Sequence, residues 1–352
     1  MKRTKNMLKL NKGEWSEPYC LLKIMSDKKL FLCEPNLSSA GISISVTGGR
    51  LSDNITYRIN DDAVSFSIKN NEKEYSFAHL QEITASVLVE LKKAQPRTFP
   101  IAVIEQLFSE IGSPSIKSKS SNKSDCILSV YDDLINSEED LNFSIKSFLA
   151  GSPTLINASK ATNFTFNVDT DNQEFKELKA KALIRKLNES KSTITFTGMD
   201  SNVYSRNLML IDTQMPLVIS EVLKIYFGSK IKFISEIVKT LEQTNPLNIV
   251  DVSLYKNKVS DFLFYSSTGM FPNKKWEGIQ DIDGGCIIVK DDGEVSTFYI
   301  FRKSFLVKFR EYLYNQCFLD TASTTRHQFG RLYKENDKMN LKLNLQVRIM
   351  KI

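Results

Sequence analysis

The chain has 352 residues, of which 41% are hydrophobic, and its formal net charge is +6. These values predict a globular protein with one large domain or two domains, and they exclude a disordered chain. No run of about 18 uncharged apolar residues occurs, and Lys9 and Lys12 precede any apolar segment of a signal peptide. Secretion and membrane insertion are therefore not expected.

Five widely spaced cysteines without a Cys-x-x-Cys pair predict neither a disulfide framework nor a zinc site. A reducing cytoplasm is the expected location. Only two histidines are present, His79 and His327, so a histidine-based metal centre is not expected. Because no glycine-rich phosphate-binding motif occurs, a nucleotide cofactor is not expected either.

The first predicted element is a helix over residues 14–25, in which Trp15, Tyr19 and Leu22 recur at helical spacing. At 100° per residue, Glu14 lies nearer than Glu17 to the centre of this apolar stripe. Glu14 is therefore the better candidate metal ligand of the two. The alternative is a helix N-terminal carboxylate that the helix dipole favours.

Short alternating runs separated by turn signals, among them Gly48-Gly49, predict three strands, and two amphipathic helices follow. The strands are expected over residues 42–46, 56–59 and 63–68, and the helices over residues 77–91 and 101–111.

Asp125 opens a short β-like run, residues 126–131, and a second run, residues 141–145, ends at Lys146. If the two strands are neighbours, Asp125 and Lys146 lie side by side. A carboxylate can bind a divalent cation beside a phosphate, and a lysine can orient the attacking water, as metal-dependent phosphodiester hydrolysis requires. An edge hairpin with solvated charges is the alternative.

Polar segments flank this pair of strands. A serine- and lysine-rich loop, residues 113–122, precedes it, and small polar residues follow it from 151 to 163. Such side chains suit hydrogen bonds to phosphates and base edges, although they are also ordinary loop formers. The candidate DNA contacts here are Lys117, Lys119, Lys123, Ser152, Thr154, Asn157, Lys160 and Asn163.

Helical and then β-like patterns follow. A surface helix is expected over residues 173–188, and a long helical pattern over residues 216–244 breaks or bends at Gly228. We place the domain boundary near its start. The later strands are expected over residues 249–255, 262–266, 286–290 and 295–301.

The C-terminal segment is basic. Residues 302–352 contain eleven Lys and Arg against four acids, a net +7, so the other residues sum to −1. A basic segment on an otherwise neutral chain is typical of a protein that binds the phosphate backbone. A merely solvated surface is the alternative.

Several short stretches together resemble the HpaII family of type II restriction endonucleases, and the resemblance extends from residue 11 to 348. The paired strands also resemble the PD-(D/E)XK nuclease core, although Ser124 replaces the proline and Ser144 the second acid. The family-like stretches are Asn11-Lys12-Gly13-Glu14-Trp15-Ser16-Glu17, Phe143-Ser144-Ile145-Lys146-Ser147, Gly151-Ser152-Pro153-Thr154-Leu155-Ile156-Asn157-Ala158, Thr162-Asn163-Phe164, Ser323-Thr324-Thr325-Arg326-His327 and Leu343-Asn344-Leu345-Gln346-Val347-Arg348.

The resemblance implies an α/β (α+β) fold with a mixed central sheet flanked by helices and an additional α+β C-terminal region. Residues 1–215 would form the catalytic domain and residues 216–352 the DNA-recognition region. Mg²⁺ would be held by Asp125 and by Glu14 or Glu17, with Lys146 orienting the nucleophile and Ser144 at the missing acid's position.

The resemblance also implies cleavage of double-stranded DNA at CCGG after the first cytosine. The products would carry 5′-phosphate and 3′-hydroxyl ends. Methylation of the site would block cutting, and the methyltransferase would be encoded separately. Two alternatives stay open: a structure-specific repair nuclease of similar core, and a DNA-binding protein that no longer cleaves, which the loss of an acid at Ser144 favours.

Arginine pairs bidentately with guanine, and cytosine N4 needs an acceptor such as a glutamine oxygen. The candidate base-reading residues are therefore Arg326, His327 and Gln328, followed by Gln346 and Arg348, which share one face of an alternating strand. Alternatively, Arg326 contacts only phosphate and Arg348 forms a structural ion pair.

Overall fold

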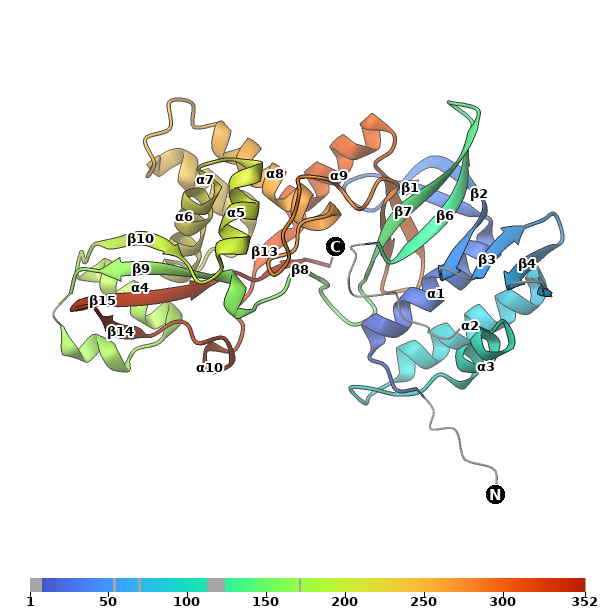
Figure 1. Ribbon diagram of the computed structural model, residues 1–352, viewed down its shortest axis with the longest axis horizontal. Coiled ribbons are helices and arrows are strands. Elements are labelled where there is room, and N and C mark those ends of the chain that lie inside the picture. The colour runs from blue at the N-terminus through green and yellow to red at the C-terminus, as the bar shows by residue number, and fades with distance from the viewer. Residues whose placement is uncertain (1–7, 53–54, 69–70, 113–123, 171, 352) are drawn as a thin grey trace, which may run out of the picture. The chain divides into compact units, whose positions relative to one another are not determined.

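The computed structural model describes residues 8–52, 55–68, 71–112, 124–170 and 172–351. The chain divides into two compact units, coloured along the sequence in Figure 1. Unit 1 comprises residues 1–153, 281–309 and 351–352, and unit 2 comprises residues 154–280 and 310–350. Both units contain helices and β-sheet, so the predicted mixed α+β class is confirmed. Within the described residues, no helix is long and apolar enough to cross a lipid bilayer.

A nine-stranded sheet forms the framework of unit 1, in the order β1-β12-β11-β7-β6-β2-β3-β4-β5. Because β1 also pairs with β2, the first six strands close into a ring, so the predicted central sheet is closed over most of its width. The β1–β12 and β7–β11 pairs are parallel. The strands are β1 (Lys29–Cys33), β2 (Ser39–Ser52), β3 (Ile55–Ile59), β4 (Ala63–Ile68), β5 (Asn71–Ser76), β6 (Cys126–Asp132), β7 (Ser137–Ser147), β11 (Gly285–Val289) and β12 (Val295–Tyr299).

The predicted turn at Gly48-Gly49 is wrong, because both glycines lie inside β2. At this point β2 pairs with β6 on one side and with β3 on the other. A Cβ atom on Gly48 would collide with the carbonyl oxygen of Tyr57, and one on Gly49 would lie 2.5 Å from that of Ile127. These glycines therefore allow close backbone approach and do not reverse the chain.

Three helices of unit 1 lie where the sequence predicts them: α1 (Lys12–Asp27), α2 (Phe77–Lys93) and α3 (Ala102–Glu110). Two buried aromatic side chains of α1 donate hydrogen bonds to backbone carbonyls. The Trp15 indole donates to Phe99 at 2.7 Å, and the Tyr19 hydroxyl donates to Gly293 at 2.7 Å. Since residue 293 lies between β11 and β12, α1 is fixed against the ring by contacts distant in sequence.

Unit 2 contains two smaller sheets, ordered β10-β9-β15-β14 and β13-β16-β8, together with its own helices. The strands are β8 (Thr154–Ile156), β9 (Asn163–Val168), β10 (Ile194–Met199), β13 (Cys317–Leu319), β14 (Leu332–Glu335), β15 (Lys338–Asn344) and β16 (Val347–Ile349). The helices are η1 (Lys160–Thr162), η2 (Gln173–Glu177), α4 (Ala180–Glu189), α5 (Asn202–Ile211), α6 (Met215–Gly228), α7 (Ile234–Thr244), α8 (Leu254–Thr268), α10 (Thr324–His327) and the C-terminal part of α9 (Lys303–Gln316).

Three sequence-based assignments differ from the structure in unit 2. The strands predicted over residues 249–255 and 262–266 are wrong, because the helix α8 occupies most of this region. Its aromatic composition is β-like, but Tyr255, Val259 and Phe262 are buried at helical spacing. The helix predicted over residues 173–188 is interrupted between η2 and α4.

The predicted break at Gly228 is confirmed, since α6 ends there. The two compact units divide between residues 153 and 154, and residues 281–309 return to unit 1, whereas the functional boundary near residue 215 stays a prediction. The physical reason is that β11 and β12 complete the ring, and long-range strand pairing leaves no local composition signal.

Candidate active site and nucleic-acid interface

The register of β6 and β7 brings Asp125 and Lys146 together, as predicted. Asp125 donates its backbone N–H to the Phe143 carbonyl at 2.9 Å, and its Oδ2 accepts the N–H of Ile145 at 2.6 Å. The Lys146 Nζ lies 3.9 Å from the same Oδ2. Both side chains are about one-fifth exposed, so the pair is open to a substrate yet held by backbone hydrogen bonds of neighbouring strands.

The two faces of β7 differ in character. Phe143 and Ile145 point into the hydrophobic core, so the alternate residues Ser144 and Lys146 lie on the opposite face. Ser144 is buried and stands opposite Cys286 of β11, with which its hydroxyl forms a hydrogen bond. The residue at the position of the second acid is thus engaged in a contact between strands.

The charge of Asp125 acts on three buried thiols: Cys20 on α1, Cys126 on β6 and Cys286 on β11. Burial is the main reason that the pKa of each thiol is raised, and the Asp125 charge raises each pKa further. Lys146 acts on Cys286 in the opposite direction and lowers its pKa. The thiols therefore stay protonated at neutral pH.

The two glutamates of α1 have different surroundings. Glu14 completes a capping box: its Oε2 accepts the N–H of Asn11 at 2.9 Å, and its own N–H donates to the Asn11 side chain at 3.0 Å. Glu17 raises the pKa of the Cys20 and Cys126 thiols, which also respond to Asp125. Glu17 therefore shares an electrostatic environment with Asp125.

The sequence-based ranking of the two glutamates assumed one buried face on α1. The helix is instead buried on several sides, with Ser16 and Cys20 as inaccessible as Trp15 and Leu22. Angular distance from a single apolar stripe consequently does not rank Glu14 above Glu17.

The Asp125–Lys146 pair offers few carboxylates, and this suits a cation that keeps most of its water. Among residues 8–351 that the structure describes, no group of three or more His, Cys, Asp or Glu side chains could hold a metal ion. Mg²⁺ usually takes one or two carboxylates and completes its octahedron with water and substrate phosphate oxygens. Asp125 with one glutamate of α1 fits that requirement, whereas a closed protein cage does not.

The predicted DNA contacts that flank the two strands differ in exposure, and some lie outside the described residues. Lys117, Lys119 and Lys123 lie outside the described residues. Asn157 and Lys160 are exposed, and Ser152 and Thr154 are half-buried. These residues are placed as a surface contact requires, and their roles remain predictions.

Asn163 differs from these surface residues, because its side chain is fully buried. Its amide nitrogen donates to the Asp200 carboxylate at 3.0 Å and to the His327 carbonyl at 2.9 Å. Its oxygen accepts from the Asn344 amide at 2.7 Å. Both of its N–H donors and its oxygen are thus engaged inside the protein, so the buried amide supports the α10 region from within and is not offered at the surface.

The candidate base-reading residues near 326 lie on the short helix α10 and its C-cap. Arg326 and Gln328 are exposed, and Gln328 adopts the left-handed conformation with φ 55°. Burial, and then the charge of Arg326, lower the pKa of His327 below its usual value. His327 is therefore neutral at pH 7 and can accept as well as donate a hydrogen bond.

The second pair of candidates lies where β15 ends and β16 begins. Gln346 and Arg348 are both half-buried and alternate with the buried Val347, so they share one face as predicted. Arg348 forms an ion pair with Asp320 at 3.2 Å, which matches the structural alternative. Asp320 also donates its backbone N–H to the Gln346 carbonyl at 3.1 Å, and this second contact holds residue 320 against the segment that carries Gln346 and Arg348.

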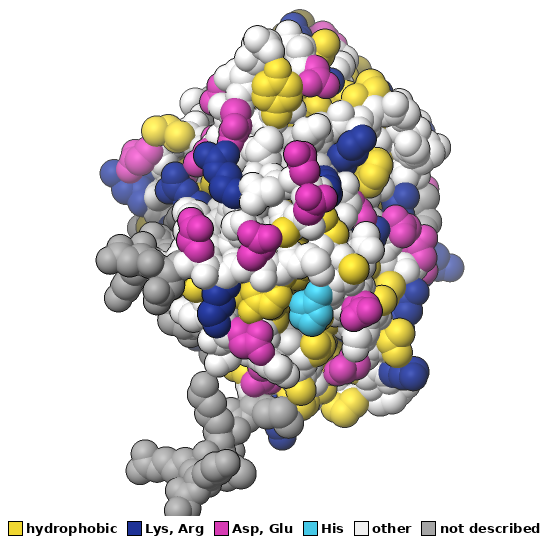
Figure 2. All heavy atoms as spheres, turned by 90° about the vertical axis from the view of Figure 1, so that its right-hand side faces the viewer, with side chains coloured by type: hydrophobic (Ala, Val, Ile, Leu, Met, Phe, Trp, Pro, Cys, Tyr) yellow, Lys and Arg dark blue, Asp and Glu magenta, His cyan; other side chains and the backbone are white. Residues whose placement is uncertain are grey.

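The sequence-based prediction omits Arg331, an exposed residue three positions after Gln328. The basic composition of residues 302–352 was the available signal, but it does not distinguish Arg331 from neighbouring cations. By contrast, the face of unit 1 seen in Figure 2 mixes acidic and basic side chains. On that unit, Arg50 pairs with Asp140 and Arg58 with Glu138.

Comparison with known proteins adds to this geometry. A family model described as HpaII restriction endonuclease matches residues 11–349. The type II restriction enzyme HpaII of Haemophilus parainfluenzae is 33% identical over 354 residues, which cover 97% of this chain and 98% of that relative. No solved structure matches the chain.

Proposed function

Since this chain belongs to the HpaII restriction endonuclease family, and is thus a type II site-specific deoxyribonuclease, we propose that Asp125 and Lys146 form its hydrolytic centre. The observation that carries the proposal is the 3.9 Å approach of the Lys146 ammonium to the Asp125 carboxylate on neighbouring strands. A PD-(D/E)XK core needs a pairing of an acid and a lysine, and the proposal is supported by Asp125, directly before β6, lying beside Lys146 on β7.

The roles follow from the chemistry of each group. Asp125 would hold Mg²⁺ through the carboxylate that the Ile145 N–H orients. When bound, Mg²⁺ polarises the scissile phosphate and makes water more acidic. Lys146 positions the attacking water for in-line displacement, and its charge stabilises the negative charge that develops on the phosphate oxygens. The products are 5′-phosphate and 3′-hydroxyl ends.

Glu17 is our first choice for the second carboxylate, in place of Glu14. The support is twofold: the Glu14 carboxylate is engaged in the capping box, and Glu17 acts on the same two thiols as Asp125. A carboxylate on α1 would compensate for Ser144, which occupies the usual position of the second acid. Ser144 then contributes by fixing β7 against β11.

The proposed target is CCGG in double-stranded DNA, cut after the first cytosine. Its G·C pairs match the chemistry of two exposed side chains: Arg326 can donate to guanine O6 and N7, and Gln328 can accept from cytosine N4. Methylation of the site would block cleavage, and a separately encoded methyltransferase would protect the host. The free, buried cysteines accord with a cytoplasmic setting.

A plasmid digest tests the proposal. In Mg²⁺, the protein should cut unmethylated plasmid into the CCGG fragments and leave CCGG-methylated plasmid intact. Cleavage that needs a lesion or junction would instead indicate a repair nuclease. Specific binding without any cleavage in Mg²⁺ or Mn²⁺ would indicate a protein that has lost catalysis, as the serine at position 144 alone would suggest.

A further inference from the structure

The arginines of unit 2 fall into two groups. Four of them use their guanidinium inside the protein: Arg185 donates to the Ser229 carbonyl, and Arg206, Arg310 and Arg348 pair with Glu277, Asp261 and Asp320. For Arg326 and Arg331, no guanidinium hydrogen bond or ion pair is formed with any residue that the structure describes. Both lie within six residues of each other, on the loop that includes α10.

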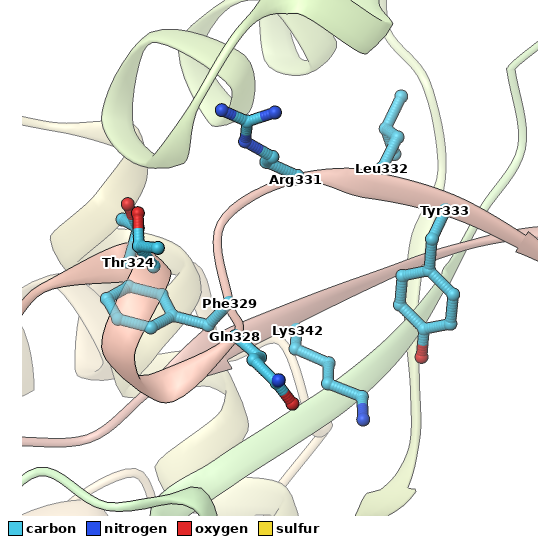
Figure 3. Close-up of a pocket in the computed structure, with 8 residues that line it drawn as sticks. Thr324, Gln328, Phe329, Arg331, Leu332, Tyr333 and Lys342 are labelled. Atoms are coloured by element: carbon cyan, nitrogen blue, oxygen red, sulfur yellow. The ribbon is translucent and has the colours of Figure 1, made fainter.

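Beside this loop is an open pocket of about 560 Å³, shown in Figure 3. Its lining contains two cations and no acid. Lys342 is neutralised by Asp200 at 2.8 Å, so Arg331 carries the unbalanced positive charge. The pocket is lined by Thr324, Thr325, Gln328, Phe329, Arg331, Leu332, Tyr333 and Lys342.

The polar side chains that line the pocket point in two directions. In Figure 3 the ends of Gln328, Lys342 and Tyr333 point to one side, and the Arg331 guanidinium lies on the other. If Gln328 faces base edges, Arg331 reaches a different part of the DNA, and its planar fork of donors matches a phosphate.

The loop is fixed from several distant segments. The Gly330 N–H donates to the Lys342 carbonyl at 2.8 Å, and the Ala180 N–H donates to the Gly330 carbonyl at 2.7 Å. Gly330 has φ 79°, and a Cβ there would approach Ala180 to 3.2 Å. Asn163, whose amide binds the His327 carbonyl at 2.9 Å, holds the other end. The loop is thus ordered before any ligand binds, which lowers the entropic cost of contact.

We propose that Arg331 binds a backbone phosphate of the substrate DNA at this pocket, and that Asn163 is a positioning residue that fixes the α10 loop for DNA recognition. The proposal rests on the endonuclease function and, for its second half, on CCGG as the cognate site. Arg331 sets affinity for any duplex, whereas Asn163 acts through the backbone that carries Arg326 and Gln328.

Arg331→Gln tests the phosphate contact in the full-length protein. Binding is measured in Ca²⁺ on a CCGG duplex and a scrambled duplex at two salt concentrations. The variant should lose about 10-fold in affinity for both duplexes, and the salt slope should fall by about 1. Lys334→Gln is the matched control, because Lys334 is exposed nearby but already paired with Asp337 at 2.8 Å.

A loss confined to the CCGG duplex, or a change no larger than that of Lys334→Gln, would overturn the phosphate assignment. If the wild-type protein does not prefer CCGG, the proposed target fails, yet the salt slope on either duplex still tests Arg331. The two failures are therefore distinguishable.

Asn163→Ala tests the positioning role. The ratio of cognate to scrambled affinity should fall about 10-fold while the salt slope stays unchanged, because no phosphate contact is removed. Asn340→Ala is the control: this buried amide on β15 bonds the Lys338 carbonyl and not the α10 loop, so only thermal stability should fall.

Gly330→Ala provides a second route if Asn163→Ala does not fold, because it displaces the same loop from its other end. The positioning role is excluded if a folded Asn163→Ala or Gly330→Ala variant keeps the wild-type affinity ratio.

Discussion

The Asp125–Lys146 pair and the α10 loop are held in place by different means. Asp125 is fixed by backbone hydrogen bonds between two strands adjacent in sequence. The α10 loop is fixed by contacts from β9, α4 and β15, which are distant in sequence. The pair is one-fifth exposed, whereas Arg326 and Arg331 are exposed on the surface of unit 2.

With the roles proposed for the pair and the loop, this difference separates the hydrolytic site from the site of DNA recognition. Groups on strands are positioned by register, and register is set by the hydrophobic pattern, so catalytic geometry is robust to changes elsewhere. Groups on a loop depend on the distant side chains that support it, so recognition is more sensitive to substitution in the core of unit 2. The following experiments test that contrast.

The largest effect is expected from the hydrolytic pair. Asp125→Ala or Lys146→Ala should reduce cleavage by about 10²–10³-fold or more, because each removes a charged group that acts on the reacting phosphate. Specific binding in Ca²⁺ should remain largely intact. Single-turnover cleavage and a binding titration give the two quantities. Asp140→Asn, on the same hairpin but paired with Arg50, should cleave normally. Full activity in Asp125→Ala would mean that the site is elsewhere.

The second-largest effect is expected on the stability of unit 1, from Asp132→Asn. Asp132 is buried and forms an ion pair with Arg302, so the loss of one partner should cost about 3 kcal/mol in the free energy of unfolding, measured by urea denaturation. The Arg302 guanidinium is the main reason that the pKa of Asp132 is lowered.

The sign of the pH dependence follows. A carboxyl with a lowered folded pKa contributes stability above its unfolded pKa, about 3.9, and loses it as the pH falls through the folded value. The difference between wild type and Asp132→Asn should therefore shrink below about pH 4. A constant difference down to pH 2 would exclude the charge of Asp132 as its cause.

Substitution of each glutamate of α1 tests which of them binds Mg²⁺ together with Asp125. Glu17→Gln should reduce cleavage about 10- to 100-fold by weakening Mg²⁺ binding, and excess Mg²⁺ should partly restore it. Glu14→Gln should retain most activity, because glutamine can also complete a capping box. Cleavage rates across a Mg²⁺ titration decide between them. A dead Glu14→Gln with an active Glu17→Gln would restore the sequence-based ranking.

Base reading by the loop is tested with Arg326→Ala. Loss of a bidentate guanine contact should cost about 1–3 kcal/mol on the CCGG duplex and little on a scrambled one. A phosphate contact would weaken both duplexes similarly and flatten the salt slope. Competition binding at two salt concentrations distinguishes the two, and a uniform loss would rule out base reading by Arg326.

The smallest effect is expected at Arg348. Its ion pair with Asp320 joins side chains that are 32% and 39% exposed, so Arg348→Ala should change stability by at most about 1 kcal/mol. DNA affinity should be unaffected if the pair is purely structural. A cognate-specific loss of affinity would return Arg348 to the base-reading residues.

Local pattern predicted much of the fold. The helices α1, α2 and α3 and the break at Gly228 lie where periodicity and caps place them. Strands were wrongly predicted in the region of α8, because its aromatic residues favour β-structure. Burial along one face of a helix decided the outcome. Asn163 was assigned to DNA because asparagine is typical of both polar surfaces and buried networks.

By itself, the sequence determined the family and the pairing of Asp125 with Lys146. That pairing needs only two short strands and the turn between them, so the information is local. Tertiary structure alone decided that residues 281–309 return to close the ring, that Glu17 and Asp125 act on the same two buried thiols, and that Asn163 supports α10 from inside. Each of these depends on contacts between segments far apart in the chain, which composition and spacing do not encode.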